Sequence, residues 1–142
     1  MTEYADRYGI DVAIEPLRRT ECNILNLVSE GTLLSALVNH PRIGALGDTF
    51  HMICSSEPYD ALIYAGEKLK HIHISHTISN EKGRVWPCLG DGEDYRALFA
   101  CLERARYTGR VSVEASCDDI AAQANETFQA LDLARRGKNG LG

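Results

Sequence analysis

Short apolar runs recur along the chain, and each is followed by a stretch with apolar residues at helical spacing. The runs predict strands at 11–15, 42–47, 70–75 and 110–114. Helices are expected at 2–9, at about 21–38 with Thr20 as its cap, after Ser56 and Pro58, after Asp94, and after Asp118 or Asp119. Four strand-then-helix units favour an α/β fold with a parallel sheet, and strands this short are typical of a (β/α)8 barrel.

The apolar positions also predict which faces are buried. In the last helix the expected buried stripe is Ile120, Ala124, Phe128 and Leu131. On the strands, the residues expected to face the inside of a barrel are Ala13, Ile43, Ala45, Ile72 and Val113. A polar loop is expected at 76–93. No strand is followed by a GxGxxG motif, so a dinucleotide site has no support.

Composition narrows the class of protein. The chain has 142 residues, of which 44% are hydrophobic and 25% charged, as in one globular domain. A net charge of −5 provides no basic footprint for nucleic acid or an anionic membrane, and no apolar run is long enough to span one. The five cysteines form no CxxC pair, which argues against structural zinc and a disulfide framework and fits a cytoplasmic location.

Polar residues gather at the ends of the expected strands. Glu15, Asp48 and Glu114 end three of them, and the remaining strand carries two histidines, His71 and His73. In α/β barrels the carboxyl ends of the strands converge, so these carboxylates would repel one another unless a cation lay among them. A lone acid at a strand end is more often a helix cap, and one histidine is expected to be structural. Taken together, the pattern favours one divalent ion, Mn²⁺, Mg²⁺ or Co²⁺, with Zn²⁺ as an alternative.

Four segments carry a resemblance to a known family. They are IEPLRRTE (14–21), LGDTFHM (46–52), LKHIHIS (69–75) and YTGRVSVE (107–114), and the resemblance that they carry extends over residues 2–135. In letters, order and spacing they resemble the sugar phosphate isomerase/epimerase family of the xylose isomerase-like TIM barrel superfamily, and most of all its ketose 3-epimerases of the tagatose/psicose type. The resemblance implies metal ligands at Glu15, Asp48, His73 and Glu114.

The resemblance also implies a mechanism and a substrate. A ketose or sugar phosphate would bind the metal, a cis-enediolate would form, and Glu15 and Glu114 would exchange protons on opposite faces of one carbon. Glu21 and His51 match substrate-binding positions. Arg84 replaces the family's substrate-binding arginine only if the loop folds it back. A sugar dehydratase would use much the same ligands, whereas an endonuclease IV-like enzyme needs a basic surface.

The chain matches only the C-terminal half of such an enzyme, strands five to eight of the barrel. Residues 1–135 are therefore expected to form a half-barrel, and 136–142 a flexible tail. A half-barrel leaves two strand edges unpaired, so we expect self-association, with a dimer as one way of completing the barrel. The alternative is a truncated, non-catalytic half-barrel, and a partner chain carrying the missing strands would also complete the barrel.

Overall fold

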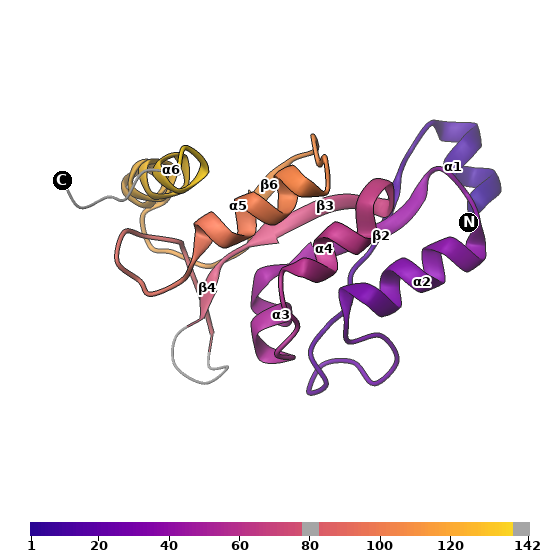
Figure 1. Ribbon diagram of the computed structural model, residues 1–142, viewed down its shortest axis with the longest axis horizontal. Helices are drawn as coiled ribbons and strands as arrows, with labels where there is room; N and C mark the ends of the chain where they lie inside the picture. Colours follow the sequence, from indigo (N-terminus) through magenta and orange to yellow (C-terminus); the bar gives the residue numbers. More distant parts are fainter. Residues whose placement is uncertain (78–82, 138–142) are drawn as a thin grey trace.

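The computed structural model describes residues 1–77 and 83–137, and the residues at 138–142 of the expected tail lie outside this range. Its main elements follow in chain order (Figure 1): α1 (Thr2–Tyr8), β1 (Val12–Ile14), α2 (Val28–Val38), β2 (Ile43–Asp48), α3 (Thr49–Cys54), α4 (Asp60–Ala65), β3 (Leu69–Ile74), β4 (His76–Thr77), β5 (Arg84–Val85), α5 (Tyr95–Arg104), β6 (Val111–Val113) and α6 (Ile120–Arg135). The four expected strand-and-helix units are all present.

The sheet is parallel, with strand order β1-β2-β3-β6. Within the part of the chain that the structure describes, β1 and β6 each pair with one strand and form the two edges. Helices α2, α4 and α5 follow one another along the sheet, and α6 packs beside α5 at the β6 end (Figure 1). The arrangement is that of four consecutive units of a (β/α)8 barrel.

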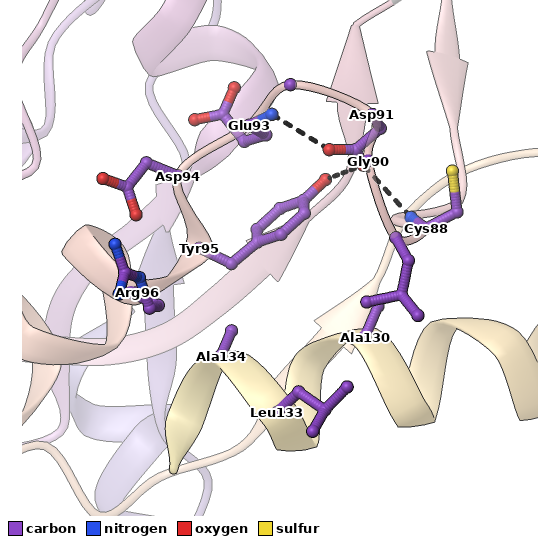
Figure 2. Close-up of a pocket in the computed structure, with 12 residues that line it drawn as sticks. Cys88, Gly90, Asp91, Glu93, Asp94, Tyr95, Arg96, Ala130, Leu133 and Ala134 are labelled. Carbon is purple, nitrogen blue, oxygen red and sulfur yellow. Dashed lines mark hydrogen bonds between the residues drawn. The ribbon is translucent and has the colours of Figure 1, made fainter. Parts of the chain in front are cut away.

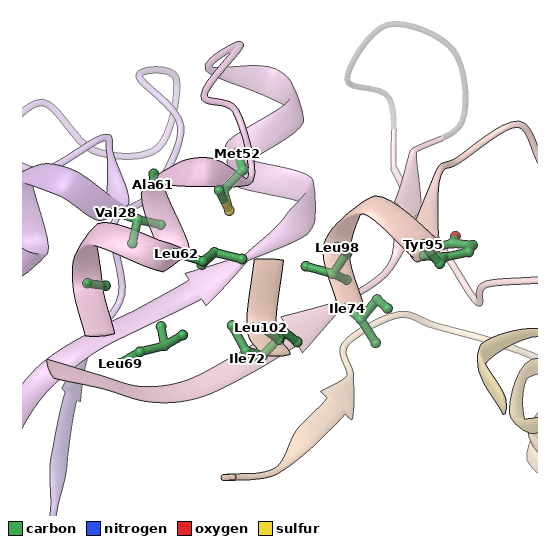
Figure 3. Close-up of a cluster of buried hydrophobic side chains, with 11 residues drawn as sticks. Val28, Met52, Ala61, Leu62, Leu69, Ile72, Ile74, Tyr95, Leu98 and Leu102 are labelled. Atoms are coloured by element: carbon green, nitrogen blue, oxygen red, sulfur yellow. The ribbon is translucent and has the colours of Figure 1, made fainter. Parts of the chain in front are cut away.

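The hydrophobic core lies between the sheet and its helices (Figure 3). Leu62 of α4 and Leu98 of α5 are fully buried against Ile72 and Ile74 of β3. Burying side chains of this size stabilises the fold by about 1.5–3 kcal/mol each. The short units therefore obtain much of their stability from the helix layer.

The same contacts correct the expected strand faces. Ile72 packs in the helix-side core, and the register with β6 gives Val113 the face of Ile74. In β2, a Cβ on Gly31 of α2 would lie 3.5 Å from that of Ala45, so Ala45 also faces the helices, as does Ile43 by alternation. The expectation that these four line the inside was wrong, because helices cover this face and draw its apolar side chains toward them.

The opposite face of the strands is the concave one, and it carries small and polar residues. Register places Gly44 beside Ala13, Leu46 beside His71, Asp48 beside His73, and His73 beside Ser112. The pairing of β2 with β3 is irregular, since Ala45 pairs with Leu69 and Leu46 already pairs with His71. Lys70 is therefore an extra residue in the ladder, as in a β-bulge.

Helix α2 begins at Val28, seven residues later than the expected start at 21. The carboxylate of Glu57 accepts the N–H groups of Val28 (2.7 Å) and Ser29 (3.1 Å), and Glu30 accepts that of Leu27 (3.1 Å). These contacts satisfy the free N–H groups of the first turn. The expected cap, Thr20, was wrong because the decisive carboxylate comes from a distant loop.

Of the remaining expectations, some are confirmed and others are wrong. The side chains of Asp94 and Asp119 accept N–H groups of α5 and α6, so both expected caps are confirmed. The expected stripe of α6 is wrong in part, because Ile120 and Phe128 are exposed while the helix buries Thr127 and Ala130. Helix α3 and the β4–β5 pair were not expected, and residues 78–82 of the expected loop lie outside the described range. None of the described helices is long and apolar enough to cross a membrane.

Candidate metal centre

Four side chains of ligand type meet at the carboxyl ends of the strands. Asp48 ends β2 and His73 lies near the end of β3, while Glu15 and Glu114 directly follow β1 and β6. Each offers one ligand atom, and these atoms all lie within 4.8 Å of one another. A parallel sheet brings the ends of its strands to one edge, so residues spread from 15 to 114 form one cluster.

His73 lies at the middle of the cluster. Its Nδ1 is 3.0 Å from Oε2 of Glu114, 3.2 Å from Oε1 of Glu15 and 3.5 Å from Oδ2 of Asp48. His71 faces the same side, but its Nε2 lies 3.0 Å from Oγ of Ser112 and its ring packs edge-on against that of His73. The strand pattern left both histidines open and the resemblance implied His73, which is the one that the structure brings to the carboxylates.

The donor set fits a divalent cation. The carboxylate of Asp48 is fully buried, and burial, reinforced by Asp48, raises the pKa of Glu114 despite the opposing charges of Arg84 and His73. Crowded carboxylates of this kind are stabilised by a positive charge. Three carboxylate oxygens and one imidazole nitrogen form a set that Mn²⁺, Mg²⁺ or Co²⁺ accepts, and Zn²⁺ also binds such groups.

His51 lies beside this cluster and is buried. Its Nδ1 accepts the backbone N–H of Arg18 at 3.1 Å, and its Nε2 lies 2.9 Å from Nη2 of Arg84. Burial, and then the charge of Arg84, lowers the pKa of His51 although Asp48 opposes this. His51 is therefore held as a neutral imidazole at the edge of the candidate centre.

Glu21 and Arg84, the other expected substrate-binding residues, are placed differently. Glu21 is partly exposed and pairs with Nε of Arg18. Arg84 enters from β5, and its Nη1 lies 2.6 Å from both Asp48 Oδ2 and Glu114 Oε2. Strand β5 thus places Arg84 against the cluster, as the expected role requires.

Phe50 was not among the expected site residues. Its buried ring has the guanidinium of Arg18 at 4.8 Å from its centroid and that of Arg84 at 4.6 Å. Such stacking fixes the position of a guanidinium. Its place between Asp48 and His51 in the segment LGDTFHM was the available signal, but an aromatic residue next to a polar motif is usually part of the core.

A second hollow lies away from this cluster, between the loop at 88–94 and α6 (Figure 2). Its volume is about 350 Å³, and Gly90 and Gly92 lie in its lining. Asp91 occupies the turn and accepts the N–H groups of Cys88 and Glu93 and the hydroxyl of Tyr95. The loop therefore satisfies its own N–H donors with its own carboxylate.

Curated relatives of the chain are sugar epimerases and isomerases. It is 31% identical over 122 residues to the L-ribulose 3-epimerase of Methylomonas sp. (strain DH-1), covering 84% of this chain and 40% of the relative. It is 33% identical over 142 residues to the fructoselysine 3-epimerase of Escherichia coli O157:H7, covering 92% and 50%. The chain therefore spans half or less of the length of these relatives.

The fold agrees with that similarity. A crystal structure of D-psicose 3-epimerase in the presence of D-fructose superposes with a TM-score of 0.77 and 26% identity, covering 98% of this chain and 53% of that one. The sequence model of the xylose isomerase-like TIM barrel family matches residues 1–136. This chain therefore belongs to the xylose isomerase-like TIM barrel family.

Proposed function

We propose that the chain is the metal-binding half of a divalent-metal-dependent epimerase or isomerase acting on a ketose or sugar phosphate. The observation that carries the proposal is the convergence of Glu15, Asp48, His73 and Glu114 within 4.8 Å at the strand ends. Similarity to ketose 3-epimerases supports the reaction class. The chain's free thiols support a cytoplasmic location.

Glu15, Asp48, His73 and Glu114 would hold the ion, for which manganese is our first choice. When bound, the ion supplies Lewis acidity that polarises the carbonyl group and makes the neighbouring C–H bond easier to break. In this proposal one glutamate, Glu15 or Glu114, takes the proton from carbon, and the other returns a proton to the opposite face. Inversion needs two such groups, and these two follow β1 and β6, which lie on opposite sides of β3 in the sheet.

Three further residues would orient the sugar. His51 offers a buried imidazole at the edge of the cluster, and Arg84 offers a guanidinium that contacts one carboxylate oxygen each of Asp48 and Glu114. Glu21 pairs with the side chain of Arg18, whose backbone N–H bonds His51, so Arg18 connects Glu21 to the edge of the cluster. We propose that these groups bind hydroxyl or phosphate oxygens of the substrate.

The working enzyme, in this proposal, is a closed barrel. The support is that β1 and β6 each have one pairing strand among the described residues, with the candidate centre on the concave side between them. A second copy would pair its β1 with β6 of the first by two-fold symmetry. A chain carrying four other βα units would complete the barrel in another way. Light scattering on the eluting chain separates a dimer from a monomer.

The second candidate function is a half-barrel that keeps the metal ligands but has no catalysis. The observation that favours it is the coverage of 40–50% of the relatives' length, which leaves out much of a full pocket. A sugar dehydratase with the same ligands is a further alternative.

One experiment tests these functions. The purified chain is incubated in D₂O with Mn²⁺ and D-fructose or D-psicose, and the sugar is followed by NMR. Epimerisation puts deuterium at C3 and forms the C3 epimer, isomerisation moves the carbonyl group, and dehydration removes water. Unchanged sugars with a barrel shown to be closed would contradict the epimerase proposal for these substrates. Metal binding without turnover by a monomer would favour the non-catalytic half-barrel.

A further inference from the structure

The guanidinium of Arg84 occupies the position among the ligands where a cation is needed. Its Nη1 lies 2.6 Å from Oδ2 of Asp48 and 2.6 Å from Oε2 of Glu114. The same two oxygens also face Nδ1 of His73, at 3.5 Å and 3.0 Å respectively. Arg84 therefore uses two of the four ligand atoms of the candidate metal centre.

We propose that Arg84 is an internal cation that competes with the divalent ion for Asp48 and Glu114. The inference rests on the proposed metal centre and adds a residue that sets its affinity. Oxygens bonded to a metal at about 2.0–2.2 Å leave no room for a guanidinium N–H on the same side, and two cations so close repel each other. Metal binding must therefore move Nη1 away from these oxygens.

The third polar contact of Arg84 indicates that this position is not fully satisfied. Nδ1 of His51 accepts the backbone N–H of Arg18, and Nε2 faces Nη2 of Arg84 at 2.9 Å. A neutral imidazole has one N–H and one lone pair, so it cannot accept from both donors. If Nδ1 accepts from Arg18, Nε2 carries the hydrogen and meets another N–H. Moving the guanidinium relieves that contact.

Phe50 holds the guanidinium of Arg84 near the site after it has left the carboxylates. Its ring lies 4.6 Å from the guanidinium carbon, and this stacking does not depend on Asp48 or Glu114. The displaced guanidinium thus stays over the ring of Phe50, where its N–H groups can bind a sugar oxygen. Arg84 would serve first as the counter-charge of the ligands and then as a substrate-binding group.

Calorimetric titration of the chain with MnCl₂ alone tests this inference. Arg84→Gln removes the competing charge, and we expect it to bind Mn²⁺ about tenfold more tightly than the wild type. It should also melt at a lower temperature in the absence of Mn²⁺, because its carboxylates have lost their counter-charge. The matched control is Arg104→Gln, an exposed arginine that pairs with Asp60, and its Mn²⁺ affinity should be unchanged.

A measurement on the wild type does not depend on the folding of that variant. The guanidinium ¹⁵N signal of Arg84, assigned by its loss in Arg84→Lys, should shift during titration with diamagnetic Mg²⁺. A signal that stays constant while Mg²⁺ binds overturns the inference, as does equal or weaker Mn²⁺ binding by Arg84→Gln. If neither the wild type nor Arg84→Gln binds Mn²⁺, the proposed metal centre fails and this inference fails with it.

Discussion

Asp48 bonds the backbone of His51 with one oxygen and faces the ligand cluster with the other. Its Oδ1 accepts the N–H of His51 at 3.0 Å, which caps α3, and its Oδ2 contacts Arg84 and His73. The side chain is thereby held in one rotamer by the helix it begins. A single residue thus joins the start of α3 to the candidate metal centre.

We predict that Asp48→Asn and Asp48→Ala both lose Mn²⁺ binding but differ in stability. The asparagine oxygen can still accept the N–H of His51, whereas alanine leaves it without a cap. The free energy of unfolding of Asp48→Ala should therefore be lower than that of Asp48→Asn by about 1 kcal/mol. Urea unfolding without metal and calorimetry with MnCl₂ give the two values. Wild-type Mn²⁺ affinity in both variants would remove Asp48 from the ligand set.

We predict that Glu15→Gln and Glu114→Gln each reduce epimerisation by roughly 10²–10⁴-fold in any active assembly of the chain. The amide cannot exchange a proton with carbon as the carboxylate does. Because both residues are also candidate ligands, Mn²⁺ content is measured in the same samples. Glu103→Gln, on the exposed face of α5, serves as the control. Full activity in either glutamate variant would contradict the two-base mechanism.

Two glycines of β2, Gly44 and Gly47, should differ in how much stability is lost when each is replaced by alanine. A Cβ on Gly44 would lie 2.1 Å from the carbonyl oxygen of Lys68, which is backbone, whereas a Cβ on Gly47 would meet the side chain of Leu62 at 2.5 Å. Overpacking of this kind costs about 1–3 kcal/mol, and backbone yields less readily than a side chain. We predict that Gly44→Ala destabilises more than Gly47→Ala.

Gly83→Ala is the matched control for this pair, since among the described residues other than its chain neighbours no atom lies within 4 Å of its added methyl group. The melting temperature should be lowest for Gly44→Ala, intermediate for Gly47→Ala, and near the wild-type value for Gly83→Ala. An equal loss at Gly44 and Gly47 would show that the strands move apart at little cost.

The hydroxyl of Tyr95 makes stability depend on alkaline pH. Burial, and then its hydrogen bond to Asp91, raises the pKa of Tyr95 well above its ordinary value of 10.0. Above that ordinary value the unfolded chain loses this proton while the folded chain keeps it, so stability falls as pH rises. We predict that the alkaline decline is shallower in Tyr95→Phe by up to about 1.4 kcal/mol per pH unit.

Urea midpoints between about pH 9 and pH 11 measure the effect. The control is Tyr64→Phe, which changes an exposed tyrosine and should leave the slope as in the wild type. If Tyr95→Phe declines as steeply as the wild type, the Tyr95 proton is not retained on folding.

The ligand cluster could be predicted from sequence because each ligand lies at the end of its own strand, and the strand ends of a parallel sheet must meet. The choice between His71 and His73 could not come from periodicity, because both point to the same face. In the structure His71 bonds Ser112 of β6, whereas His73, two residues nearer the carboxyl end of β3, contacts the carboxylates. Arg84 could be placed only by knowing how the chain returns through β5.

The start of α2 could not be predicted for a similar reason. Residues 21–27 have helical spacing, but Asn26 donates to the carbonyl groups of Leu17 and Cys22 and holds that segment in a loop. The first-turn N–H groups then find Glu57, which lies 28 to 29 residues away. Local pattern reports helix propensity, whereas these tertiary contacts determine where the helix begins.

Lys70, which has no partner in the ladder with β2, shifts the alternation of side chains along β3 by one residue. Leu69 and Ile72 are three residues apart, which strict alternation would put on opposite faces, yet both belong to the helix-side core. Without Lys70 the sequence Leu-His-Ile-His-Ile alternates regularly, so loss of this one residue would leave His73 facing the carboxylates. Loss of Ile72 would instead shift the alternation on one side of the deletion, so that core residues there would face the ligand side and ligand-side residues would face the core. The position of a length change along this strand, rather than its size, therefore decides whether the cluster survives it.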